Sequence, residues 1–118
     1  MFDDVASVTL RSALHGLSMR ERAIADNISN VQTPHFLAGK VQFEDALRDA
    51  VASGDTSEIA GARGSIARSL EPTREDGNNV NLDQETLAAT ETGLAYSLMT
   101  RAVNDRFNLL RASIGGGV

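Results

Sequence analysis

The sequence predicts an all-α protein in which two long helices, one near each end of the chain, pair as an antiparallel coiled coil. Apolar residues recur at helical spacing along both ends. Only 4% of the residues are aromatic and Trp is absent, which favours packing through Leu, Ile and Ala. At 118 residues, the chain is expected to form a single domain over residues 1–118.

The N-terminal helix is expected over residues 4–31. Asp4 is typical of a helix N-terminus, whereas Pro34 disfavours helical geometry at Thr33 and marks the other end. Glu21 interrupts an otherwise apolar line whose 4-3 spacing is typical of a coiled-coil seam. The residues of this line are Leu10, Leu14, Leu17, Ile24, Ile28 and Val31.

The middle of the chain has a weaker pattern. Residues 32–42 are expected to form a turn or extended segment, and residues 43–52 a short helix that ends near Gly54. Residues 53–80 are expected to be a flexible loop, because they bury too little apolar surface to offset the entropy of ordering. The large aliphatic residues of this loop are Ile59, Ile66 and Leu70, together with Val80 at its end.

The C-terminal helix is expected over residues 82–114. Asn81 is placed to cap its first turn, with Gln84 at the third position, and Gly115 follows its last residue. Two displaced apolar stripes run along it: Leu87, Leu94 and Leu98, then Met99, Val103, Phe107, Leu110 and Ile114. Such stripes are typical of an intramolecular core, but the length of the helices favours one stripe facing the first helix and the other facing another molecule.

Composition argues against several classes of function. Eleven basic against sixteen acidic residues give a formal charge of −5, which opposes binding to nucleic acid. The chain has no Cys, and His15 and His35 stand far apart without further ligands at metal-binding spacing. A solvated helix face explains the acidic residues Glu44, Asp45 and Asp49. We therefore expect no catalytic residues, no metal, no cofactor and no enzyme activity.

No apolar run approaches the length that crosses a bilayer, so direct membrane insertion is not expected. The start Met1-Phe2-Asp3-Asp4 lacks the basic region of a secretory signal, and we expect no cleaved signal peptide. Binding at a membrane surface is an alternative, but the polar faces carry charges of both signs, as in Arg20-Glu21-Arg22.

The end of the first helix carries the most specific stretch, residues 25–36. Asn27 and Asn30 lie three residues apart in the last turn, where short amides can bond freed carbonyls or the chain that follows. Thr33 and Pro34 then break the helix, and Phe36 can fold back onto the apolar seam.

This stretch resembles the N-terminal signature of the bacterial flagellar rod, hook and hook-associated axial proteins, approximately A-x-N-I-A-N-x-x-T-P-G-[YF]. Ser29 replaces the usual Ala, and His35 replaces a Gly that indicates positive φ, a conformation that His tolerates with some strain. The matching residues are Ala25, Asn27, Ile28, Asn30, Thr33, Pro34 and Phe36.

Residues 76–85 and 106–114 are similar to a short proximal-rod member of this family. The rod protein FlgC is an alternative within the family, although it usually lacks the Asp76-Gly77-Asn78-Asn79 stretch. A helical export adaptor or chaperone that wraps a client with its two seams is an alternative outside it.

The resemblance implies a structural subunit at the proximal end of the basal-body rod, in the periplasm. It implies that the N- and C-terminal helices pair as a coiled coil, and that the subunits assemble helically, transmit torque and bound the export channel. The implied partners are copies of the chain, the rod proteins FlgC and FlgF, the FliE adaptor, the MS-ring protein FliF and the flagellar type III export apparatus. The implied route of export is that apparatus.

Overall fold

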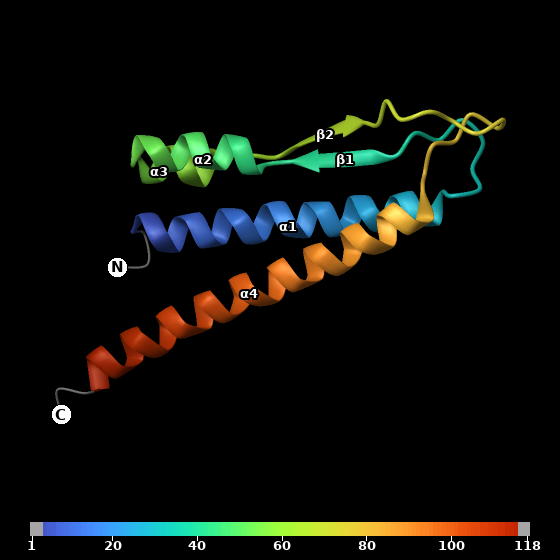
Figure 1. The fold of residues 1–118 in the computed structure, drawn as a ribbon. Coiled ribbons are helices and arrows are strands. Elements are labelled where there is room, and N and C mark those ends of the chain that lie inside the picture. Colours follow the sequence, from blue (N-terminus) through green and yellow to red (C-terminus); the bar gives the residue numbers. More distant parts are fainter. Residues whose placement is uncertain (1–3, 116–118) are drawn as a thin grey trace.

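The computed structural model describes residues 4–115, which form three layers (Figure 1). The long helix α1 (Val5–Ser29) lies in the middle. On one side of it lies a segment of two strands and two short helices, residues 39–68, which we call the hairpin layer. On the other side α4 (Leu82–Gly115) runs antiparallel to α1. The protein is thus mostly helical, with a long helix near each end.

Local hydrogen bonds set both ends of α1. Asp4 is the N-cap, and its Oδ1 accepts a hydrogen bond from the backbone N–H of Ser7 at 3.0 Å. The helix ends at Ser29, and the backbone N–H of Asn30 donates to the Asp26 carbonyl at 3.1 Å. Pro34 lies in the turns that follow, where it cannot continue a helix.

A two-stranded antiparallel sheet corrects the all-α expectation. Strand β1 (Gly39–Gln42) pairs with β2 (Ser65–Arg68), and Val41 lies opposite Ile66. Val41 and Phe43 are buried while Gln42 between them is exposed, which is the period of two that a strand requires. The extended segment expected over residues 32–42 contains β1, but the sequence prediction missed its pairing because the partner strand β2 lies in the segment expected to be a loop.

The flexible loop expected over residues 53–80 was wrong for residues 56–68, whereas residues 69–80 contain no helix or strand. Helix α2 (Glu44–Ser53) ends at Gly54, which adopts φ +73°, and α3 (Thr56–Gly61) follows directly before β2. Ile59 of α3 is fully buried, and its carbonyl accepts a hydrogen bond from Ser12 Oγ on α1 at 2.9 Å. Contacts with α1 therefore order a segment that has too few apolar residues of its own.

The core lies between α1 and the hairpin layer. It consists of Leu17, Val41 and Phe43, with Ala95 and Met99 of α4 packed at its edge. The ring of Phe43 lies where a side chain at position 16 would be, so that Gly16 permits this close contact. Above the ring lies the Arg20 guanidinium, 4.8 Å from the ring centroid, which also pairs with Glu44.

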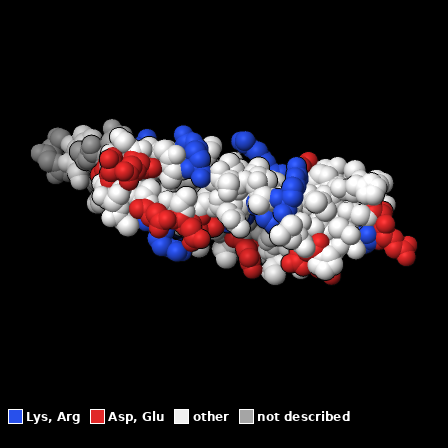
Figure 2. All heavy atoms as spheres, turned by 90° about the horizontal axis from the view of Figure 1, so that it is seen from above, with Lys and Arg blue, Asp and Glu red and all other residues white. Residues whose placement is uncertain are grey.

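Helix α4, with 34 residues, spans most of a molecule that is 68 Å long, against 27 and 14 Å in the other two directions. Its first turn is capped by Asn81, whose Oδ1 accepts a hydrogen bond from the Gln84 backbone N–H at 3.2 Å. Figure 1 shows that α4 diverges from α1 toward its C-terminal end. Figure 2 shows acidic and basic side chains interspersed over the hairpin-layer face, with wide uncharged areas between them.

Candidate functional site

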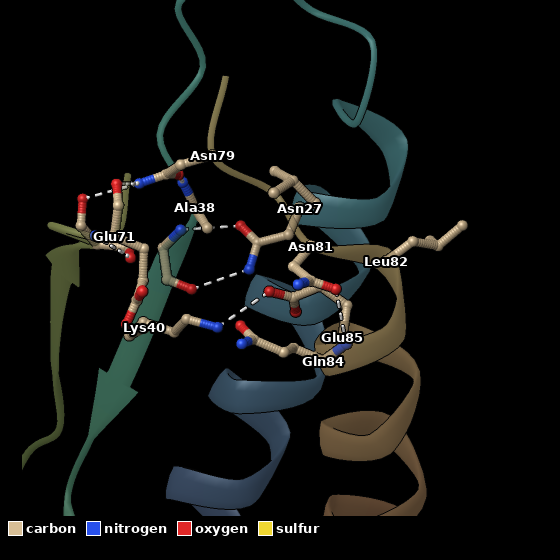
Figure 3. Close-up of polar contacts among 12 residues, drawn as sticks. Asn27, Ala38, Lys40, Glu71, Asn79, Asn81, Leu82, Gln84 and Glu85 are labelled. Carbon is tan, nitrogen blue, oxygen red and sulfur yellow. Dashed lines mark hydrogen bonds and ion pairs between the residues drawn. The ribbon is translucent and has the colours of Figure 1, made fainter. Parts of the chain in front are cut away.

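Asn27, the first asparagine of the motif, ties α1 to strand β1. Its Nδ2 donates to the Gly39 carbonyl at 2.9 Å, and its Oδ1 accepts from the Gly39 backbone N–H at 2.8 Å (Figure 3). The side chain is only 1% exposed. The amide therefore satisfies both backbone groups of a buried strand residue, which agrees with the expectation that it bonds the chain that follows.

The rest of the motif forms the turn after α1. Asn30 donates from Nδ2 to the Asp26 carbonyl at 2.8 Å, and its Oδ1 accepts from Thr33 Oγ1 at 3.0 Å. His35 has φ +63°, the left-handed conformation expected from its place in the motif. Phe36 is half-buried, with the Arg68 guanidinium 5.6 Å from its ring centroid. Thr33 and the adjoining Pro34 are exposed.

Sequence reasoning missed a second pair of asparagines that completes this network. Asn78 and Asn79 lie in the segment that was expected to be a flexible loop, but both are buried. Asn78 donates from Nδ2 to the carbonyls of Asn30 and Thr33, at 2.8 Å each. The Asn79 Oδ1 accepts from the Ala38 backbone N–H at 2.7 Å. The sequence signal that could have predicted this role is the pair of adjacent amides directly before Val80, which is buried.

An ion pair between half-buried Lys40 and buried Glu85 joins α4 to the same region. Lys40 on β1 lies 3.0 Å from Glu85 Oε1, and Figure 3 shows the two side chains meeting beside Asn27. Glu85 is 1% exposed, and its Oε2 has no hydrogen-bond partner. The pair fixes the start of α4 against β1, because separating it would leave a carboxylate buried without a counter-charge.

The α4 face that contacts the rest of the molecule is built from small and polar residues. These residues are buried or half-buried and follow a 3-4 spacing: Glu85, Ala88, Thr92, Ala95 and Met99. The leucines of the first predicted stripe lie outside this face, with exposed fractions of 60% for Leu87, 63% for Leu94 and 54% for Leu98. A line of leucines on α4 is thus uncovered within the molecule.

The second predicted stripe of α4 is divided. Met99, Val103 and Leu110 are half-buried, whereas Phe107 and Ile114 are exposed. Where α4 diverges from α1, the two helices enclose a groove of about 310 Å³. Apolar side chains from both helices line it, together with two arginines: Leu10, Val103, Phe107, Leu110, Arg11 and Arg106.

The apolar line of α1 is covered to different degrees. Leu17 and Ile24 are buried, and Ile28 is 37% exposed. The remaining members, which are half-buried, are Leu10, Leu14 and Val31. Near the start of α1, Asp4 and Ser7 bind Arg106, which fastens the C-terminal half of α4 to this helix.

Among residues 4–115, no group of three or more His, Asp or Glu side chains is arranged to hold a metal ion. His15 and His35 are both exposed and lie on α1 and in the turn after it. Asp45 and Asp49 are exposed on α2. Within the same residues, neither α1 nor α4 carries an apolar stretch that would span a bilayer.

Comparison with known proteins identifies a family. The chain is 34% identical to the flagellar basal body rod protein FlgB of Borrelia hermsii, over 71% of this chain and 76% of that protein. It is 30% identical to FlgB of Borreliella burgdorferi over the same shares, and 25% identical to FlgB of Bacillus subtilis over 92% of each chain. No family model matches the chain. On the similarity to these relatives, the chain belongs to the FlgB family of flagellar basal body rod proteins.

Proposed function

We propose that this chain is a structural subunit at the proximal end of the flagellar rod, where its copies assemble helically with other rod proteins. In this proposal α1 and α4 of each subunit pair as an antiparallel coiled coil, and residues 1–118 act as one axial unit. The assembled subunits transmit torque and bound the export channel. The family membership supports the place in the rod, and the uncovered apolar surface supports the assembly.

The uncovered leucine line of α4 is the observation that carries this proposal. Leu87, Leu94 and Leu98 are more than half exposed, and they follow the 7-4 spacing of a coiled-coil seam. Contiguous apolar surface on a helix is typical of an interface, because its contact with water is unfavourable. Neighbouring subunits are the natural cover in a protein of a rod family.

The proposed partners follow the family. They are copies of this chain, the rod proteins FlgC and FlgF, the FliE adaptor and the MS-ring protein FliF. We also propose delivery by the flagellar type III export apparatus. A thin molecule whose helices bury few large side chains is suited to threading in an unfolded state, followed by ordering on assembly.

The test is to replace Leu98 by Asp in cells that make only the variant. Leu98 is half exposed, so the isolated chain should keep its helical circular dichroism, while the variant should be absent from isolated basal bodies and the cells should not swim. The matched control is Leu70→Asp, because Leu70 is 98% exposed and lies off both long helices. Normal swimming with Leu98→Asp, or equal loss with Leu70→Asp, would refute the proposal.

A further inference from the structure

One side of α4 forms an anionic apolar ridge. Leu87, Glu91, Leu94 and Leu98 follow a 4-3-4 spacing, which places them on the same side of the helix. Glu91 is exposed like the three leucines around it. We call these four residues the α4 ridge. It offers three apolar side chains with one carboxylate near its centre.

The groove between α1 and α4 has the complementary character. Leu10 of α1 faces Val103, Phe107 and Leu110 of α4 across it. Arg11 and Arg106 also line it; Arg106 donates from Nε to Ser7 Oγ at 3.1 Å and forms an ion pair with Asp4. We call this feature the α1–α4 groove. It offers apolar walls with guanidinium groups at their margin, which suits an apolar helix face that carries a carboxylate.

The ridge and the groove of one molecule cannot contact each other. Leu94 and Phe107 are 107 − 94 = 13 residues apart, or about three and a half turns, so they lie on roughly opposite sides of the same helix. A contact between the two surfaces must therefore join two molecules. Because the surfaces lie on opposite sides, one copy can make both contacts at the same time.

Ridge-to-ridge pairing of two copies is electrostatically less favourable. In a two-fold antiparallel pair, Glu91 near the centre of one ridge would lie close to Glu91 of the other, and like charges at an apolar contact repel. Seating the ridge in the groove would instead bring Glu91 near Arg11 and the Arg106–Asp4 ion pair, so that it meets no unpaired carboxylate. Charge complementarity thus distinguishes the two arrangements.

We propose that copies of this chain join head to tail, with the α4 ridge of one copy seated in the α1–α4 groove of the next. This inference rests on the proposed assembly function and specifies its contact. Glu91 and Phe107 are 16 residues apart, so copies whose α4 helices run parallel would be displaced by about 24 Å along α4. A contact between two different surfaces adds copies without limit unless it closes into a ring. A helical assembly requires such an open-ended contact.

The chain has no cysteine, which makes engineered disulfides a direct test. Leu94→Cys and Phe107→Cys are expressed together in cells that lack the native chain, and isolated basal bodies are oxidised. We expect one linked dimer that contains one copy of each variant. A chain that carries both cysteines should give linked species of three or more copies. Adding Glu91→Arg should lower the yield of dimer by about fivefold.

The controls separate this contact from assembly itself. Leu70→Cys replaces Phe107→Cys in a parallel experiment and should give no dimer, because Leu70 lies outside the groove. Three outcomes would each overturn the head-to-tail contact. They are dimers between two Leu94→Cys chains, links from Leu94→Cys to a different rod protein, and no links in basal bodies that contain the variants. If instead the cysteine variants were absent from basal bodies before oxidation, although the cells made them, the proposed function would be contradicted.

Discussion

At the scale of single residues, the Asn27 side chain bonds both backbone groups of Gly39, as a neighbouring strand would. Asn27→Ala should leave the N–H and C=O of Gly39 buried without partners, at a cost of about 1–3 kcal/mol for each group. The measurement is the urea midpoint of the purified chain, followed by circular dichroism. Asn30→Ala is the control, since the Asn30 amide bonds the carbonyl of exposed Asp26 and the hydroxyl of exposed Thr33. Equal shifts for the two variants would contradict this role of Asn27.

Asp4 adds a dependence on pH. Hydrogen bonds from the side chain and backbone of Ser7, and then the charge of Arg106, lower the pKa of the Asp4 carboxyl below its ordinary value. The folded state therefore favours the ionised form. Its stabilisation is present above the unfolded-state pKa and is lost as the pH falls through the lower folded-state pKa. Asp4→Asn should be less stable than the natural chain at pH 6, and the difference should shrink toward pH 2. A difference independent of pH in thermal unfolding would refute the assignment.

At the scale of elements, two helix glycines should respond in opposite ways to the same substitution. A Cβ at Gly16 would lie within 2.6 Å of three ring carbons of Phe43, so Gly16→Ala should push the hairpin layer away from α1 and lower the thermal midpoint. A Cβ at Gly93 meets nothing within 4 Å, so Gly93→Ala should stabilise α4 by up to about 1 kcal/mol. Limited proteolysis of the hairpin layer should accelerate only in Gly16→Ala. Destabilisation by both changes would show that the close contact at Phe43 is not the cause.

The long helices could be predicted from sequence because their apolar spacing and caps are local signals. In the hairpin layer the short helix expected over residues 43–52 matches α2, but the strand pair and α3 could not be predicted, because their order comes from contacts that are distant in sequence. Ser12 bonds the Ile59 carbonyl and Asn27 bonds Gly39, and neither contact leaves a periodic pattern. A segment with few large apolar residues is then ordered by the helix that it covers.

The contacting face of α4 was hidden for a different reason. Its heptad-like spacing is carried by residues such as Glu85, Ala88 and Thr92, whose small or polar side chains do not register in a search for hydrophobic stripes. The leucines that dominate such a search point away from α1. Which stripe contacts the rest of the subunit therefore depended on the fold. The end of α1 could be predicted locally, because Thr33 and Pro34 follow it directly.

At the scale of the whole molecule, the chain is too extended to cover its own apolar surface. Its radius of gyration is 18.0 Å, whereas a compact domain of this length would have about 13.5 Å. Its accessible surface is 7777 Å², about 1,600 Å² more than the roughly 6,200 Å² expected for its mass. That excess is comparable with the total area buried in a stable protein interface.

Stability should consequently depend on protein concentration. Association of folded chains removes them from the folding equilibrium, so the thermal midpoint should rise with concentration. Leu94→Asp should abolish this rise while leaving the midpoint of the dilute chain nearly unchanged, because Leu94 is exposed in the single molecule. Leu17→Asp should lower the midpoint at every concentration, because Leu17 lies in the core. A natural chain with a midpoint constant over a hundredfold range of concentration, and with slowly exchanging amides throughout α1 and α4, would show that neighbouring subunits are not needed to stabilise the two long helices.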